Sequence, residues 1–263
     1  MRENTALAAW RRDEQTIGLW LSLPNSYSAE VMANLGFDWI CVDMQHGLID
    51  YTDLVQMLPA ISTSQATPLV RVPWNEPYEI MKALDAGAYG VVLPMVNNRE
   101  EAEQAVMACR YPPLGNRSFG PIRAAVYGGR GYAVQANDQI ACIAMIETAE
   151  GIANADEIMS TPGLNGVFIG PADLALSLGL PAMGDQPQEE HLVVVKDLLA
   201  KCKAHGIAAG IHTSSLEYAQ KYLALGFNFV NLGSESGHMT KSASAELAAA
   251  RGGVASEREN TGY

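Results

Sequence analysis

The chain alternates short apolar runs with longer stretches in which apolar and polar residues recur at helical spacing. The apolar runs are continuous rather than alternating, which is typical of strands covered on both faces. Strands are predicted at residues 18–23, 38–43, 68–72, 90–94, 140–146, 166–169, 207–211 and 228–232. Amphipathic helices are predicted between them, at residues 28–35, 51–61, 77–86, 99–109, 192–205 and 216–225.

Glycines mark the ends of several predicted helices. Gly36, Gly87, Gly206 and Gly226 each fall just before the next strand, where C-cap glycines are expected. Eight strand–helix units in 263 residues predict one domain, a (β/α)8 TIM barrel over residues 1–263. The alternative is an open doubly wound sheet. It is weakened because no G-x-G-x-x-G follows the first strand and no P-loop is present.

Two segments depart from this repeat. Residues 111–137 form a long connection rich in Gly, Pro and Arg. Long connections in compact domains are usually functional or disordered. Residues 251–263 are polar and contain glycine, so we expect a flexible tail there.

Composition narrows the function classes. The net charge of -12 argues against nucleic acid and anionic membrane partners, both of which require clustered Lys and Arg. Residues 1–16 are charged and do not resemble a signal peptide, and no apolar run is long enough to span a membrane. The four cysteines form no C-x-x-C pair, so we expect buried free thiols in a reducing, cytoplasmic compartment.

Two carboxylates stand where predicted strands end. Glu147 directly follows the run at 140–146, and Asp173 follows the run at 166–169 after Gly170. A carboxylate at the mouth of a buried strand costs free energy unless it is paired, and hard divalent cations take carboxylate oxygens. Because barrel chemistry lies at the C-terminal strand ends, this pair predicts a metal site there.

Three further ionisable groups lie at neighbouring strand ends. Arg71 interrupts an apolar strand and needs an anionic partner, which is either a ligand oxygen or one of the site carboxylates. His46 follows Asp43 by three residues, so the carboxylate is expected to orient the imidazole and raise its basicity. Together they indicate a site that moves a proton.

The lysines exclude one kind of carbonyl chemistry. None of the six lies at a strand end, and a Schiff-base enzyme needs a desolvated lysine in its pocket. Carbonyl chemistry here would therefore use a metal to hold electrons. Trp20 and His212 also lie at strand ends; for His212 both a pocket-lining and a structural role stay open.

These residues resemble the HpcH/HpaI aldolase family, the metal-dependent class II pyruvate aldolases. The similarity runs along almost the whole chain. The matching segments are Gly18-Leu-Trp-Leu21, Ser26-Tyr-Ser-Ala-Glu30, Gly36-Phe-Asp-Trp39, Asp43-x-x-His46, Arg71-Val-Pro-Trp-Asn75, Pro94-Met-Val-Asn97, Arg110-Tyr-Pro-Pro113, Ala136-Asn-Asp-Gln139, Ile146-Glu-Thr148 and Val167-Phe-Ile-Gly-Pro-Ala-Asp-Leu174. The last segment, with the glutamate upstream of it, is the most specific.

The resemblance implies a barrel assembled as a hexamer, a trimer of dimers that exchange a terminal helix. It implies Mg2+ or Mn2+, with Co2+ as a further candidate, held by Glu147 and Asp173. It also implies Arg71 on the oxygens of a pyruvate-like donor, and His46, paired with Asp43, as the base.

The remaining site residues also come from the resemblance. The backbone around Gly170, Ala172 and Asp173 would hold the donor carboxylate, and Trp20 and His212 would line the acceptor pocket. Asp85 matches a residue that the family lends to a neighbouring subunit's site.

Two positions near the metal depart from the family pattern. Gln45 replaces an acidic residue before the histidine, and Met145 replaces a glutamine two positions before the metal-binding glutamate. Each change removes a polar group near the metal and alters its surroundings. On the acceptor side, His212 replaces an apolar residue of those relatives that take a long aldehyde, and a polar residue there is expected to favour short, hydroxylated aldehydes.

The resulting hypothesis is a carbon–carbon lyase that catalyses reversible aldol cleavage of 4-hydroxy-2-oxoacids, with pyruvate or hydroxypyruvate as donor. Two alternatives stay open. A lyase acting on a CoA thioester would need basic residues for the phosphates, and the 111–137 loop offers Arg117, Arg123 and Arg130. A barrel that binds an oxoacid without turning it over is the other alternative.

Overall fold

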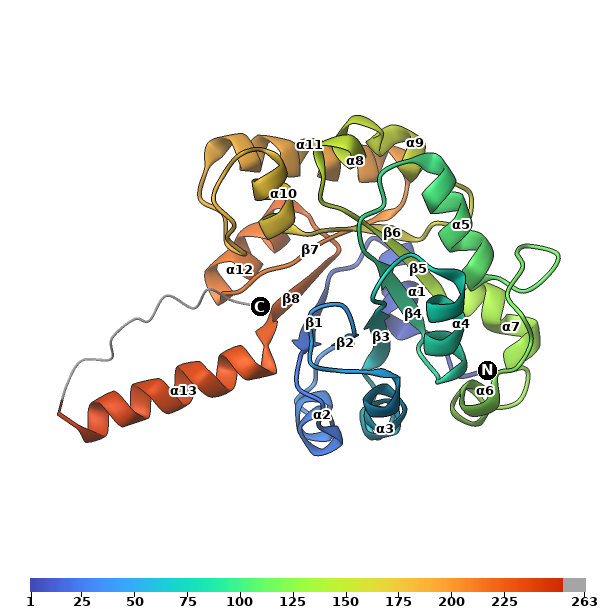
Figure 1. The fold of residues 1–263 in the computed structure, drawn as a ribbon, viewed down its shortest axis with the longest axis horizontal. Helices are drawn as coiled ribbons and strands as arrows, with labels where there is room; N and C mark the ends of the chain where they lie inside the picture. Colours follow the sequence, from blue (N-terminus) through green and yellow to red (C-terminus); the bar gives the residue numbers. More distant parts are fainter. Residues whose placement is uncertain (253–263) are drawn as a thin grey trace.

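Eight parallel strands close into a barrel in a computed structural model that describes residues 1–252 (Figure 1). Every neighbouring pair is parallel, and β8 pairs with β1 to complete the ring. The (β/α)8 prediction is therefore confirmed. The strands are β1 Thr16–Leu21, β2 Trp39–Asp43, β3 Thr67–Arg71, β4 Gly90–Leu93, β5 Ala141–Ile146, β6 Gly166–Ile169, β7 Ala208–Ile211 and β8 Phe229–Ser234.

Helices surround the barrel, and all six predicted ones are present within a few residues of their expected bounds. They are α2 Ser26–Ala33, α3 Tyr51–Ile61, α4 Pro77–Asp85, α5 Arg99–Cys109, α11 Glu189–His205 and α12 Leu216–Leu225. The other helices are α1 Thr5–Arg11, α6 Ile122–Gly128, α7 Tyr132–Gln139, α8 Ala149–Ala153, α9 Ala155–Met159, α10 Pro171–Ser177 and α13 Glu235–Ala250. Helix α13 points away from the barrel (Figure 1).

The barrel interior is packed with large side chains. Trp39 fits because Gly18 faces it: a Cβ on Gly18 would lie 2.0 Å from the indole ring. Phe229 fits beside Gly210 for the same reason. Trp10 of α1 stacks on Phe229 with ring centroids 4.3 Å apart. The interior is therefore filled, as in other barrels of this kind, and open space is left at its C-terminal mouth.

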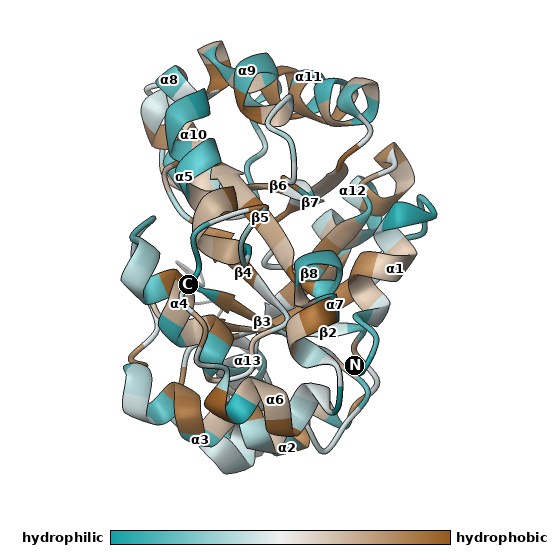
Figure 2. Cartoon of the chain, turned by 90° about the vertical axis from the view of Figure 1, so that its right-hand side faces the viewer, coloured by the Kyte–Doolittle hydropathy of each residue, from teal (hydrophilic) through white to brown (hydrophobic). Residues whose placement is uncertain are grey.

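A second apolar layer lies between the strands and the helices. Figure 2 shows apolar residues along the central strands, while the helices mix apolar and polar faces. All strand residues of β2 to β7 are buried, as their continuous apolar runs predict. This layer fixes the strand ends that carry the polar groups.

The long connection after α5 is ordered in the structure. It contains α6 and most of α7, and the buried Arg117 holds it against α4 through an ion pair of 2.6 Å with Asp85. Sequence patterns predicted only a long loop here because each helix is shorter than the windows that reveal helical periodicity.

Other sequence-based expectations have mixed outcomes. All four cysteines are free and buried, as predicted. Within residues 1–252 no helix combines the length and apolar character needed to cross a bilayer. The flexible tail was predicted for residues 251–263, of which 253–263 lie outside the described residues.

Candidate active site

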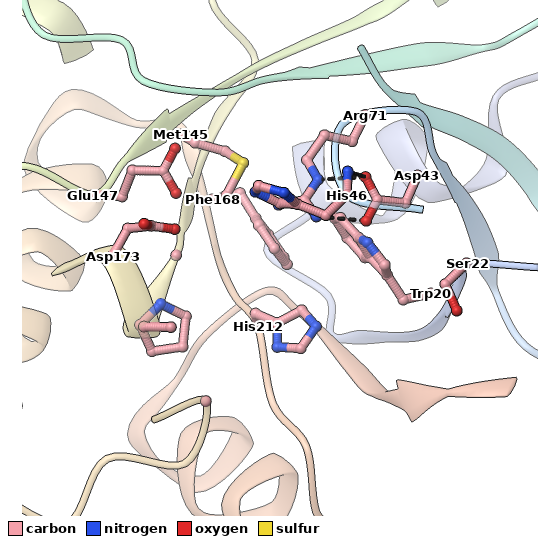
Figure 3. A pocket seen from close by; sticks show the side chains of 14 residues that line it. Trp20, Ser22, Asp43, His46, Arg71, Met145, Glu147, Phe168, Asp173 and His212 are labelled. Carbon is pink, nitrogen blue, oxygen red and sulfur yellow. Dashed lines mark hydrogen bonds and ion pairs between the residues drawn. The ribbon is translucent and has the colours of Figure 1, made fainter. Parts of the chain in front are cut away.

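A pocket opens at the C-terminal mouth of the barrel (Figure 3). Nine of the residues singled out in the sequence line it, contributed by strand ends and the segments that follow them. They are Trp20, Asp43, His46, Arg71, Glu147, Gly170, Ala172, Asp173 and His212. The expectation that functional residues lie at strand ends therefore identified residues that are far apart in the sequence and that the fold brings together.

Asp43 and Arg71 form a buried, two-pronged ion pair on one side of the pocket. Arg71 Nε donates to Asp43 Oδ1 at 2.8 Å, and Nη2 donates to Oδ2 at 2.5 Å. The two residues face each other because β2 and β3 pair in register, with Asp43 opposite Arg71. Burial opposes the charge on Asp43, but the Arg71 hydrogen bonds and charge hold the Asp43 pKa below its usual value.

Asp43 also contacts the segment that carries His46. Asp43 Oδ1 accepts hydrogen bonds from the backbone N–H groups of Gln45 and His46, at 3.0 and 3.2 Å. The carboxylate therefore fixes the turn that carries His46, while both of its oxygens bind Arg71. Strand register brings Arg71 to the same carboxylate, a second partner that sequence proximity did not indicate.

His46 is suited to accept a proton. Burial, followed by the positive charge of Arg71, lowers the His46 pKa below its usual value, while Asp43 and Asp173 partly oppose this shift. The imidazole is therefore neutral at pH 7. Figure 3 shows its ring over the centre of the pocket, near Arg71.

The opposite side of the pocket carries the carboxylates of Glu147 and Asp173, which face the same space (Figure 3). Glu147 is 2% exposed, and its Oε1 accepts a hydrogen bond of 2.8 Å from Met95 N–H. Burial, with a contribution from the charge of Asp173, raises the Glu147 pKa to about 7. This carboxylate is costly to ionise as the chain stands.

A divalent cation fits this pair. Within residues 1–252 no group of three or more His, Cys, Asp or Glu side chains converges as a metal site, so Glu147 and Asp173 form a two-ligand set. The backbone at Gly170 approaches Glu147 so closely that a Cβ there would lie 2.1 Å from Oε2. The buried, poorly compensated carboxylate supplies the negative charge and hard oxygen that such ions prefer.

The backbone is strained on the side of the pocket that carries Glu147. Met95 has a φ of 56°, unusual for a residue other than glycine, and its N–H is the group that binds Glu147. Strained residues cluster at functional sites because the surrounding structure holds them in place. Met95 was not singled out in the sequence, since no local pattern signals its conformation.

Aromatic rings form a wall between the two sides. Trp20 stacks on Phe168 with centroids 5.3 Å apart, and the Arg71 guanidinium lies 5.1 Å from the Trp20 ring. His212 meets Trp20 edge-on at 5.5 Å. Burial, followed by the charge of Arg71, lowers the His212 pKa to about 4, so this ring is neutral.

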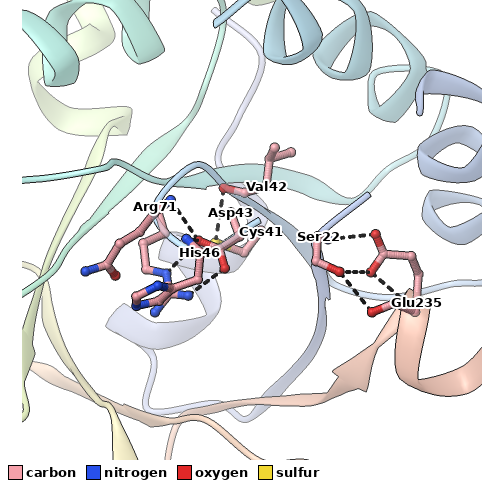
Figure 4. Close-up of polar contacts among 9 residues, drawn as sticks. Ser22, Cys41, Val42, Asp43, His46, Arg71 and Glu235 are labelled. Carbon is pink, nitrogen blue, oxygen red and sulfur yellow. Dashed lines mark hydrogen bonds and ion pairs between the residues drawn. The ribbon is translucent and has the colours of Figure 1, made fainter. Parts of the chain in front are cut away.

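Ser22 extends the pocket beyond Trp20 (Figure 3) and was missed in the sequence; Figure 4 shows its contacts with Glu235. The buried carboxylate of Glu235, at the start of α13, accepts hydrogen bonds of 2.7 Å from the Ser22 and Leu23 N–H groups. Ser22 Oγ also lies 2.9 Å from Ser236 Oγ. The rule that barrel sites gather at strand ends could have found Ser22, which directly follows β1.

Asp85 lies outside this pocket. It ends α4, and Arg117 holds its Oδ1. Met145, noted as a departure from the family pattern, does line the pocket, together with Gly184 from the loop before α11. No sequence signal marked Gly184.

Comparison with known proteins also indicates an aldolase. The HpcH/HpaI aldolase/citrate lyase family model matches residues 16–242. The chain is 41% identical to a hydroxypyruvate/pyruvate aldolase of Rhizorhabdus wittichii, covering 94% of this chain and 99% of the relative. It is 38% identical to a 2-dehydro-3,6-dideoxy-6-sulfogluconate aldolase of Pseudomonas putida, covering 96% and 99%.

The fold agrees with these relatives. The crystal structure of an HpcH/HpaI aldolase/citrate lyase family protein from Burkholderia cenocepacia superposes with a TM-score of 0.89 at 35% identity, covering 94% of this chain and 99% of that one. The resemblance of the sequence motifs is therefore confirmed. The chain belongs to the HpcH/HpaI aldolase/citrate lyase family and is a carbon–carbon lyase.

Proposed function

We propose that the chain catalyses reversible aldol cleavage of 4-hydroxy-2-oxoacids, with pyruvate or hydroxypyruvate as the donor and a short hydroxylated aldehyde as the acceptor. One observation carries the proposal: a preformed cation, Arg71, lies across the pocket from the buried Glu147 and the half-buried Asp173, and the pocket also holds a neutral imidazole. The names of the similar aldolases support the oxoacid class.

The donor would be held at the Glu147–Asp173 side. Glu147 and Asp173 would hold Mg2+ or Mn2+, with Co2+ as a further candidate, and the ion would supply positive charge to stabilise an enolate. The Gly170–Asp173 backbone begins α10, so its N–H groups are suited to a donor carboxylate. Arg71, already fixed by Asp43, places a second positive charge against the donor oxygens.

His46 would move the proton. In the cleavage direction its neutral imidazole accepts the proton of the 4-hydroxyl group, and in the addition direction it returns that proton. Asp43 contributes by fixing the turn and by keeping Arg71 in place. This division of roles assigns Asp43 to positioning.

The acceptor would lie against Trp20, His212 and Ser22. These groups form an aromatic wall with polar atoms at its far end. A short aldehyde that carries hydroxyl groups suits that combination better than a long apolar one.

We rank a lyase that acts on a CoA thioester below the aldolase. Two of the arginines considered for CoA phosphates have structural partners: Arg117 binds Asp85 and Tyr132, and Arg123 binds Ala86 O and Ser62 Oγ. The remaining assembly and location predictions, a hexamer built from dimers that exchange α13 and a cytoplasmic enzyme, stay proposals.

Proton exchange tests the proposed function directly. Pyruvate methyl protons should exchange with deuterium in the presence of enzyme and Mg2+ or Mn2+, and a chelator should abolish the exchange. Full exchange after chelation would contradict the proposal. A retro-aldol assay separates catalysis from mere oxoacid binding, because a non-catalytic barrel releases no pyruvate.

A further inference from the structure

The segment that joins β4 to α5 carries a hydrogen-bond network to which the proposed function assigns no role. It contains Met95, whose backbone lies in the left-handed region and whose N–H donates to Glu147 Oε1. For a residue other than glycine this conformation is unfavourable and persists only where neighbouring groups hold it. The groups that hold Met95 therefore also help to set the direction of the Glu147 carboxylate.

The side chain of Asn97 is one of these groups. Its Nδ2–H donates to Met95 O at 2.9 Å, and its Oδ1 accepts a hydrogen bond from Thr148 Oγ1. Thr148 directly follows Glu147, so the Asn97 amide links the strained peptide to the residue beside the carboxylate. One side chain thereby connects the segment after β4 to the segment after β5.

The Asn97 amide is not used to cap the helix that follows it. The next residue, Asn98, caps α5 by accepting a hydrogen bond of 2.9 Å from the Glu101 N–H. Asn97 does not line the active-site pocket either. Any influence of Asn97 on the site would therefore pass through Met95 and Glu147.

The backbone of Asn97 is held on both sides. Its N–H donates to Glu101 Oε2 at 2.7 Å, and its carbonyl accepts a hydrogen bond of 2.8 Å from Asn154 Nδ2. The preceding residue, Val96, donates its N–H to Met145 O at 3.1 Å. Because these bonds fix the main chain, the Asn97 side chain has a defined direction toward the strained peptide.

The two oxygens of Glu147 have different surroundings. Oε1 accepts the hydrogen bond from Met95, whereas a Cβ on Gly170 would lie 2.1 Å from Oε2. Gly170 directly precedes α10, whose first turn carries Asp173. The hydrogen bond from Met95 therefore leaves Oε2 on the side of the second carboxylate, where a cation would bind.

We propose that Asn97 is a positioning residue for the cation site: by holding Met95 in its left-handed conformation, it directs Glu147 Oε2 toward Asp173. This inference rests on the proposed function, because it assumes that the two carboxylates hold a divalent cation. Groups that orient metal ligands contribute roughly 10- to 100-fold to metal affinity or activity. Asn97 is therefore expected to act on cation affinity.

Mn2+ binding without substrate, measured by electron paramagnetic resonance, tests the proposal. Asn97→Ala should raise the Mn2+ dissociation constant about tenfold or more. Asn154→Ala is the matched control, because it removes an amide-to-carbonyl hydrogen bond from the same segment and leaves Met95 untouched. It should bind Mn2+ like the wild type. Equal dissociation constants for Asn97→Ala and wild type would overturn the proposal.

A second substitution separates positioning from a general loss of packing. Glycine populates the left-handed region about as readily as the right-handed one and keeps the backbone N–H. Adding Met95→Gly to Asn97→Ala should therefore restore part of the lost Mn2+ affinity. A double variant that binds Mn2+ no better than Asn97→Ala would contradict a role through the Met95 conformation.

Thr148 tests the other end of the network and does not depend on the folding of Asn97→Ala. Thr148→Val removes the hydroxyl that binds Asn97 and should weaken Mn2+ binding, whereas Thr148→Ser keeps it and should bind like the wild type. The same hydroxyl caps α8 through the Gly151 N–H, so the urea midpoint is measured as well. A Thr148→Val protein that loses stability but binds Mn2+ normally would overturn the proposal.

Pyruvate proton exchange separates this role from the aldol function. At Mn2+ concentrations that saturate Asn97→Ala, its exchange rate should approach that of the wild type. A rate that stays low at saturation, with an unchanged dissociation constant, would overturn the positioning role. Wild-type protein that binds Mn2+ without exchanging protons would contradict the proposed function alone, and wild-type protein that binds no Mn2+ would contradict both.

Discussion

The two sides of the active-site pocket differ in how completely the chain satisfies its own charges. On the β2–β3 side, Asp43 and Arg71 neutralise each other through two short hydrogen bonds. On the β5–β6 side, Glu147 has a raised pKa and lies beside a second carboxylate, with Arg71 across the pocket. On the β2–β3 side the chain compensates its own charges, whereas the carboxylates on the β5–β6 side are suited to bind a cation.

This difference indicates how the two sides contribute to stability and to chemistry. Removing the Asp43 carboxylate leaves Arg71 buried and charged without a partner, whereas neutralising Glu147 removes a buried charge that is poorly compensated. A carboxylate substitution should therefore have opposite effects on stability in the two places, although both substitutions lower activity.

The largest effect is expected at Glu147. Glu147→Gln should lower kcat/KM for retro-aldol cleavage about a thousandfold, or about 4 kcal/mol, because an amide cannot supply the charge that holds a cation. The urea midpoint at pH 7 without metal should stay unchanged or rise. Glu150→Gln, exposed on α8, is the control. A Glu147→Gln enzyme that keeps a tenth of its activity would contradict the metal-ligand role.

The second largest effect is expected for the ion pair between Asp43 and Arg71. Asp43→Asn should lower the free energy of unfolding by about 3 kcal/mol, because Arg71 remains charged and buried without its partner. Denaturant unfolding measures the change. Glu14→Gln breaks the exposed pair with Arg12 and should leave stability unchanged. If both variants lost the same amount, the β2–β3 side would not be the self-contained element described here.

His212 should produce a smaller, pH-dependent effect. Its folded pKa of about 4 lies below the usual value of 6.5, so the unfolded chain takes up the proton first as pH falls. Stability present above pH 6.5 should therefore be lost progressively towards pH 4, by about 2 kcal/mol between pH 7 and pH 5.

Urea unfolding of wild type and His212→Gln at both pH values measures that loss. The glutamine variant lacks the titrating ring and should lose less stability, by the same amount, over this interval. Parallel pH profiles for the two proteins would show that His212 is solvated rather than desolvated.

The smallest effect is expected at Ser22, which tests whether the self-contained side continues into acceptor recognition. Ser22→Ala should raise KM for glyceraldehyde about tenfold, corresponding to one lost hydrogen bond, and should leave KM for propanal unchanged. Pyruvate proton exchange should not change. Ser26→Ala on α2 is the control, and an equal KM increase for both aldehydes would rule out a hydroxyl contact.

Much of the site could be predicted from the sequence, because strands covered on both faces read as continuous apolar runs and any polar residue after them stands out. Glu147, Asp173, Arg71 and His212 were found in this way. The partner of Arg71 could not be chosen, since it depends on the register between β2 and β3. The predicted pairing of Asp43 with His46 is local in the sequence, whereas its pairing with Arg71 needs two strands to be aligned.

Other features left no sequence signal. The positive φ of Met95 is imposed by its surroundings, and Gly184 reaches the pocket through the path of a long loop. The ordered helices α6 and α7 depend on tertiary contacts such as the ion pair between Arg117 and Asp85. Such features arise from long-range packing, which a single sequence does not reveal.

The carboxylate of Glu235 links two segments of the chain that are far apart in the sequence. Glu235 is the first residue of α13, which extends away from the barrel, and its side chain binds the backbone of Ser22 and Leu23. The start of α13 and the acceptor end of the pocket therefore share one buried carboxylate, so a substitution at Glu235 is expected to disturb both.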